Sequence, residues 1–319
     1  MTTLREAEPL DAEAVRPGRL GGLVASMRPR QWIKNLACFA GLIFSGHLFD
    51  AEALGRAAWA FAGFCLASSS IYLINDVCDR RSDAANPKKR SRPIASGRVS
   101  VAWALATSAA LAASALGSSL LLTPGCSAAL LTYLVMNLAY SIRLKHTVLL
   151  DVMIIAIGFV LRILYGAFAV SVPPTPWIVL CMFFLALFLG FSKRRSELIR
   201  FEGGDAGHRP VLLKYRTGLL DLLLAMTATM AITCYALYTV IGRPDHGTLV
   251  LTVPLVVYGV YRYLLIVLVF DVGDTPEKDL IDDPPLIAAV IAWVVLCVLI
   301  LYLDINFIHP VGLTAPPAH

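Results

Sequence analysis

Apolar runs of near-spanning length recur along the whole chain, separated by short polar or charged connections. A helix needs about 20 predominantly apolar residues to cross the hydrocarbon core of a bilayer. The pattern therefore predicts nine membrane-spanning helices, of which the first is short. They are expected near residues 33–49, 54–75, 99–122, 126–142, 151–172, 176–192, 218–241, 248–270 and 285–303.

Composition agrees with this pattern. Of 319 residues, 58% are apolar and 15% charged, with a mean hydropathy of +0.72. So few polar residues could not cover a water-exposed surface, and no room is left for a separate soluble domain. We expect an all-α polytopic membrane protein, with one transmembrane catalytic domain at 23–305 between a flexible tail at 1–22 and a short tail at 306–319. The first tail lacks the apolar core of a signal peptide.

Basic residues alternate between the two ends of the predicted helices. Seven Lys or Arg lie within 80–98 and seven within 193–216, whereas Arg56 and Arg243 are the only ones near the opposite ends. The positive-inside rule then places the N-terminus and the basic loops in the cytoplasm and the C-terminus outside the cell membrane. The net charge of +5 is therefore explained by the positive-inside distribution of basic residues, and no nucleic-acid partner is expected. A loop at 271–283 holds six acidic residues and has no assigned role.

An acidic segment follows the second predicted span. Asn75, Asp76, Asp79 and Asp83 are spaced so that a continuing helix would bring all four onto one broad face. Carboxylate and amide oxygens are hard ligands suited to Mg²⁺, which often shares its ligands with substrate phosphates. The alternative is a solvated helix end, but three acids in register beside an amide favour a metal-dependent diphosphate site.

A basic loop at 86–97 comes directly after the acidic segment. Lys89, Arg90 and Arg92 could bind phosphate oxygens directly while the carboxylates bind them through the metal. Positive-inside topology alone could also explain this cluster.

These two segments carry a resemblance. The pattern Asn75-Asp76-x-x-Asp79-x-x-x-Asp83, followed by Lys-Arg-x-Arg-Pro-Ile-Ala-Ser-Gly at 89–97, resembles the UbiA superfamily of intramembrane prenyltransferases. The resemblance implies a UbiA-type helical bundle with two aspartate-rich motifs, each holding Mg²⁺ on a prenyl diphosphate in a cavity open to the cytoplasm. The second motif should follow the fourth span, yet the stretch from Tyr140 to Asp151 contains one acid.

That departure points to a branch with different substrates. Residues 28–35, Leu144-Lys145-His146 with Asp151, Gly158-Phe159-x-x-Arg162 and Lys193-Arg194-x-x-Glu197-Leu198 resemble the decaprenyl-phosphate phosphoribosyltransferase branch. The resemblance implies Mg²⁺-dependent transfer of 5-phosphoribose from phosphoribosyl pyrophosphate to a polyprenyl phosphate, as in cell-wall biosynthesis. It implies that Asp76, Asp79 and Asp83 are catalytic and, with Asn75, hold the metal. The candidate substrate-binding residues are Lys34, Asn75, Lys89, Arg90, Arg92, Tyr140, Lys145, Asp151, Arg162, Lys193 and Arg194.

Several of these residues have ordinary alternatives. Lys34 could anchor the first span at the headgroups, and Lys193 could pair with Glu197 one helical turn away. Arg162 lies about halfway along an apolar run, where a charge is costly unless it faces a cavity or a partner. His146 beside Lys145 is interpreted as a surface residue.

Two other functions stay open at this point. An ordinary prenyltransferase could use Asp151 as a reduced second motif and move a prenyl group to an aromatic or other acceptor. A lipid or solute transporter would also place charges inside spans, but its charges should form a path across the bilayer. Polyprenyl length and oligomeric state, including a homo-oligomer, are not determined by the sequence.

Overall fold

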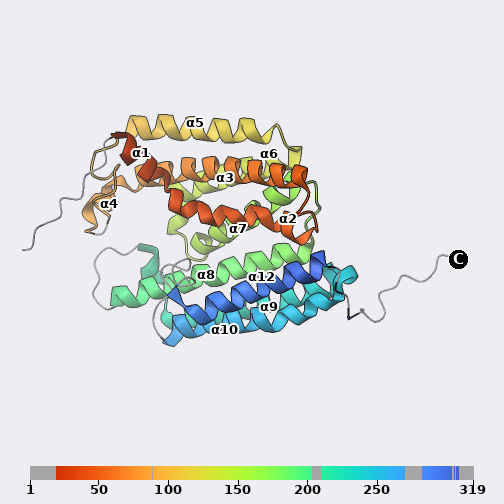
Figure 1. Ribbon diagram of the computed structural model, residues 1–319. Coiled ribbons are helices and arrows are strands. Elements are labelled where there is room, and N and C mark those ends of the chain that lie inside the picture. The colour runs from red at the N-terminus through yellow and green to blue at the C-terminus, as the bar shows by residue number, and fades with distance from the viewer. Residues whose placement is uncertain are drawn as a thin grey trace, which may run out of the picture.

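The computed structural model describes residues 19–87, 89–202, 210–269, 282–303, 305, 307 and 308. Within these residues the chain is helical and contains no strand. The long helices run side by side along a common direction (Figure 1). Eight of them are long and apolar enough to cross a membrane. The prediction of an all-α, multi-pass membrane protein is confirmed.

The eight helices match eight of the nine predicted spans. Caps at several N-termini explain where they begin: Asp50 accepts hydrogen bonds from Glu52 N and Ala53 N, and Ser100 accepts one from Trp103 N. The spanning elements are α3 (Ala51–Cys78), α5 (Val101–Ser119), α6 (Pro124–Ile142), α7 (Leu150–Ala169), α8 (Pro176–Glu202), α9 (Thr217–Leu237) continued by η4 (Tyr238–Gly242), η5 (Pro244–Thr252) continued by α10 (Val253–Val269), and α12 (Pro284–Tyr302).

The first predicted span, 33–49, has a different structure. It is covered by η1 (Pro29–Phe39), a 3₁₀ stretch, and by the short α2 (Ala40–Phe44), after α1 (Arg19–Met27). Pro29 begins η1, and the buried Asn35 interrupts its apolar run. Among the described residues this segment is therefore too irregular to count as a ninth spanning helix.

Two groups of helices form the bundle, with a core in each. One core joins α3, α5, α6 and α7 around Phe64, Leu130 and Tyr165. The other joins α7, α8, α9, α10 and α12 around Phe188 and Leu224. Helix α7 contributes to both cores and packs on α8, so it connects the two groups.

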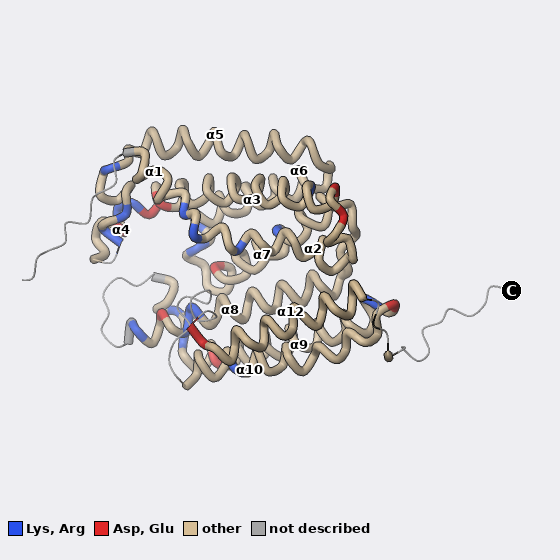
Figure 2. Tube along the Cα trace, viewed as in Figure 1, with Lys and Arg blue, Asp and Glu red and all other residues tan. Residues whose placement is uncertain are grey.

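Charged residues gather at one end of the bundle, which we call the charged end. It carries α4 (Arg80–Ala85), η2 (Leu144–His146), η3 (Pro210–Lys214) and the end of α8 (Figure 2). The predicted basic connections thus meet at one end of the helices. Most of the predicted tails and most of the acidic loop at 271–283 lie outside the described residues, and the domain boundaries remain a prediction.

Candidate functional site

The acidic segment lies where α3 ends at the charged end. The expected single helix is interrupted at Asp79, whose φ of −89° and ψ of 0° end α3, and α4 begins at Arg80. The interruption is slight, because Asp83 N still donates to Asp79 O at 2.8 Å. Asp76 and Asp83 are both buried, whereas Asp79 is partly exposed.

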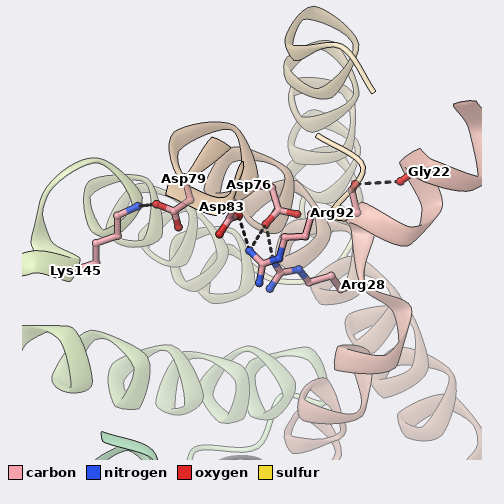
Figure 3. A network of polar contacts seen from close by, with 8 residues as sticks. Gly22, Arg28, Asp76, Asp79, Asp83, Arg92 and Lys145 are labelled. Atoms are coloured by element: carbon pink, nitrogen blue, oxygen red, sulfur yellow. Dashed lines mark hydrogen bonds and ion pairs between the residues drawn. The ribbon is translucent and has the colours of Figure 1, made fainter. Parts of the chain in front are cut away.

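One guanidinium joins the two buried carboxylates. Arg92 Nη1 lies 2.7 Å from Asp83 Oδ2 and 3.3 Å from Asp76 Oδ1. Arg28 also forms an ion pair with Asp76 Oδ1, and its guanidinium lies 5.2 Å from the centre of the Tyr72 ring. Figure 3 shows both arginines pointing at this carboxylate pair. Two carboxylates that converge on one cationic nitrogen offer oxygen ligands of the kind that Mg²⁺ takes.

Asp79 takes a different direction from its two neighbours. Its Oδ1 lies 2.5 Å from Lys145 Nζ, and the pair points away from Arg92 in Figure 3. In the described part of the chain, no group of three or more His, Cys, Asp or Glu is placed to hold a metal ion. The predicted convergence therefore holds for Asp76 and Asp83. Substrate oxygens would have to supply further metal ligands, as is usual for Mg²⁺.

The fold of the basic loop explains how Arg92 reaches the acids. Ile94 and Val99 are buried against Leu73 of α3, so the loop turns back over the end of that helix. Gly97 has a φ of +77°, which glycine adopts without strain, and it reverses the chain before α5. Arg90 is exposed and Lys89 half-buried, both on the same loop.

Asp151, the lone acid of the expected second motif, is engaged within the protein. It is fully buried at the start of α7, with Oδ2 2.7 Å from Arg194 Nε of α8. Its Oδ1 accepts a hydrogen bond from the Tyr215 hydroxyl at 2.8 Å. Burial raises the pKa of Tyr215, and the Asp151 charge raises it further, so the hydroxyl remains a donor. Arg194 also pairs with Glu197 at 2.5 Å.

The structure places the remaining candidates around this end and along α7. Tyr140 is buried near the end of α6, and Lys193 is half-buried on α8 beside Arg194. Asn75 precedes Asp76 on the last turn of α3. Arg162 lies on α7 and is hydrogen-bonded to Asn35 at 2.8 Å.

A large apolar cavity lies between the two groups of helices. Its volume is about 560 Å³, and its walls come from η1, α2 and α7 on one side and from α8, α9, α10 and α12 on the other. Among the described residues that line it, Lys34 is the only charged one. A site of this size, with apolar walls and a cation on one wall, suits an apolar chain that carries an anionic group.

Three residues of this region were not predicted as site residues. Arg28 lies in a basic segment that also suits a headgroup anchor, and its positive φ of 55° cannot be recognised in the sequence. Asn35 ends the 28–35 segment that carries part of the resemblance, but nothing in the sequence indicates its contact with Arg162. Tyr215 has no sequence signal, because its partner lies far away along the chain.

Comparison with known proteins identifies the family. Residues 35–278 match the UbiA prenyltransferase family. A decaprenyl-phosphate phosphoribosyltransferase of Mycolicibacterium smegmatis is 39% identical over 69% of this chain and 70% of its own length. A protein of the same name from Corynebacterium glutamicum is 31% identical over 88% of this chain and 87% of its own length.

Solved structures agree on the fold. A UbiA homolog from Archaeoglobus fulgidus bound to DMAPP and Mg²⁺ superposes with a TM-score of 0.66 at 18% identity, covering 89% of this chain and all of that one. The same homolog bound to Cd²⁺ gives a TM-score of 0.64 over 87% of this chain and 99% of that one. The chain is an enzyme of the membrane, and it belongs to the UbiA prenyltransferase family.

Proposed function

We propose that this enzyme transfers 5-phosphoribose from phosphoribosyl pyrophosphate to a polyprenyl phosphate and releases pyrophosphate. The reaction depends on Mg²⁺ and takes place at the charged end, which faces the cytoplasm. The observation that carries the proposal is the similarity to proteins named decaprenyl-phosphate phosphoribosyltransferase, over as much as 88% of the chain.

The donor's pyrophosphate is assigned to the end of α3. Asp76 and Asp83 are the residues that would hold Mg²⁺, which supplies positive charge for the leaving pyrophosphate. Arg92 and Arg28 already lie against these carboxylates and are within reach of phosphate oxygens that enter with the metal. Lys145, paired with Asp79, adds a further positive charge at the edge of the same site.

The acceptor's chain is assigned to the apolar cavity. Its lining residues on α8 extend from Ile178 to Leu189, about 16 Å along a helix and roughly half of the hydrocarbon core. Lys34 on the cavity wall offers a positive charge to the lipid phosphate. The two substrates can therefore meet at the boundary between water and hydrocarbon.

The transfer step needs no strong base from the protein. An oxygen of the lipid phosphate, already anionic near neutral pH, forms a bond to the anomeric carbon as the bond from that carbon to the pyrophosphate oxygen breaks. The bonding electrons leave with pyrophosphate, so no proton has to be removed from the nucleophile. The protein's part is to orient two anions and offset their charge.

The buried network around Asp151 separates this reaction from the alternative prenyl transfer. An ordinary prenyltransferase with a second metal site would need Asp151 as a ligand, but both of its oxygens are engaged by Arg194 and Tyr215. A second metal would have to displace Arg194, which is 2% exposed, from a buried ion pair, and this is costly. At Asp76 the paired arginines are 30% exposed, so a metal can displace them at a lower cost. This favours a single acidic site and thus the phosphoribosyl transfer.

Parallel assays with the two donor classes test the proposal. Purified protein in detergent with Mg²⁺ is given either labelled phosphoribosyl pyrophosphate and polyprenyl phosphate, or a labelled prenyl diphosphate and an aromatic acceptor. We expect product in the first assay and none in the second. The reverse result would assign the chain to ordinary prenyl transfer.

A further inference from the structure

Arg162 is a buried arginine inside a membrane-spanning helix. It lies near the middle of α7, is 6% exposed, and is not among the residues that line the large apolar cavity. A guanidinium at such a depth is costly unless the protein satisfies it. The contacts that satisfy it show what the residue is for.

The side chain is held by neutral oxygens and aromatic rings. Nε donates to Asn35 Oδ1 at 2.8 Å, Nη1 to Gly158 O at 2.8 Å and Nη2 to Tyr133 Oη at 3.3 Å. The guanidinium carbon lies 4.9–5.2 Å from the ring centres of Phe64, Phe159 and Tyr133. All three nitrogens are thus engaged within the protein, and the ring faces provide electrostatic attraction for its charge. This arrangement favours the alternative that Arg162 is satisfied by partners within the protein.

Asn35 connects Arg162 to a second helix. It is fully buried in η1, and its Nδ2 lies 3.1 Å from Ser68 Oγ and 3.3 Å from Cys65 Sγ, both on α3. One amide therefore links η1 to α3 through its nitrogen and to α7 through its oxygen. Since η1 has eleven residues, and 3₁₀ runs longer than about four residues are uncommon, the stretch needs such tertiary contacts.

The position of η1 matters because charged residues precede Asn35 within a few positions in the chain. Arg28 directly precedes η1 and meets Asp76, while Lys34 is the neighbour of Asn35 and lines the apolar cavity. At about 2 Å of rise per residue, the 28–34 segment spans only about 12 Å. A shift of η1 would therefore move both side chains relative to Asp76 and the cavity.

We propose that Arg162 is a positioning residue: through Asn35 it fixes η1, and with it the places of Arg28 at the acidic site and of Lys34 at the cavity wall. Arg162 acts without touching either substrate. The kinetic part of this proposal rests on the proposed function, whereas its structural part concerns η1 alone.

The test compares Arg162→Lys with Arg195→Lys. Arg195 is also a buried arginine on a spanning helix. It also donates to a backbone carbonyl, Val267 O of α10, and it pairs with Asp221 of α9. Amide hydrogen exchange of the purified proteins is followed by mass spectrometry in peptides covering 29–39 and 51–78. Donor and acceptor KM and kcat are measured in parallel. Asn35→Ser serves as a second variant if Arg162→Lys does not fold.

The expected result is faster exchange in 29–39 for Arg162→Lys and Asn35→Ser, with 51–78 unchanged. Donor KM should rise about tenfold, the loss expected when one charge-assisted contact is weakened, while kcat falls less. Arg195→Lys should change neither the exchange in 29–39 nor the donor KM. Unchanged exchange in 29–39, or a kcat loss without a KM change, would overturn the proposal. If wild-type protein transfers no phosphoribose, the proposed function fails, but the exchange experiment still decides whether Arg162 fixes η1.

Discussion

Arg92 Nη1 lies 2.7 Å from Asp83 Oδ2, so the basic loop and the acidic helix end form one site rather than two adjoining patches. Asp83 is buried and the Arg92 side chain is 30% exposed, which leaves the arginine accessible from water. A cation already lies where the proposed metal and phosphates would meet the carboxylates.

Neutralising Asp83 should stop turnover without unfolding the protein. Asp83→Asn keeps the size of the side chain but removes a proposed metal ligand, so we expect kcat to fall by at least about a hundredfold. Transfer assays and size-exclusion profiles in detergent measure the two properties. Asp245→Asn, the same substitution at an exposed residue at the opposite end of the bundle, should keep full activity. Equal losses in both variants would contradict the assignment.

Removing Arg92 should affect metal and donor in opposite directions. Arg92→Gln removes the cation that Asp83 and Asp76 share and leaves only Arg28 on Asp76, so the affinity for Mn²⁺ without substrate should rise by about tenfold, while donor KM increases. Titration calorimetry with Mn²⁺ measures the first change. A weaker or unchanged affinity for Mn²⁺ would show that the metal does not use these two carboxylates.

The network of Asp151 and Arg194 should behave as a structural ion pair. Arg194→Met leaves the buried charge of Asp151 without its ion-pair partner and should destabilise the protein by about 3–5 kcal/mol. Asp151→Asn should cost less, because Arg194 keeps its ion pair with Glu197. The double variant should lose less than the sum of the two single losses. Unfolding in detergent measures this coupling. Additive losses, together with unchanged stability on Tyr215→Phe, would argue against a shared network.

The ion pair between Arg262 and Asp283 should make the stability of the protein depend on pH. Arg262 hydrogen-bonds to Asp283 and lowers its pKa, and Asp283 also caps α12 by accepting from Leu286 N. A depressed carboxyl pKa stabilises the fold above the unfolded-state pKa, and this stabilisation is lost as pH falls through the folded-state value. Between about pH 5 and pH 3, wild-type protein should therefore lose more thermal stability than Asp283→Asn, which keeps a capping side chain. If the two proteins lost thermal stability equally over this pH range, the assignment would be contradicted.

The approximate extents of eight spanning helices, and the gathering of the basic connections at one end of the bundle, could be predicted from the sequence, because spanning helices depend on runs of about 20 apolar residues. The 3₁₀ structure of residues 29–39 could not, because it depends on Asn35 contacting Ser68 and Arg162. Such contacts between distant residues leave no pattern in a single sequence.

The candidate site also has a part that the sequence predicted and a part that it did not. The acidic pattern predicted Asp76 and Asp83 on a common face, and a close sequence neighbour, Arg92, completes the group. Asp79 departs from that face because α3 ends at this residue. The partners of Asp151 lie 43 and 64 residues away, so its engagement could be seen only in the folded chain.

The most direct measurement of the central claim uses phosphoribosyl pyrophosphate labelled with ¹⁴C in the ribose and with ³²P in the β-phosphate of the pyrophosphate group. It is incubated with Mg²⁺, polyprenyl phosphate and the purified enzyme, with and without a chelator. The account predicts ¹⁴C in the lipid phase and ³²P in water as pyrophosphate, both dependent on the metal. Lipid that carries ³²P, or lipid without ¹⁴C, would contradict phosphoribosyl transfer.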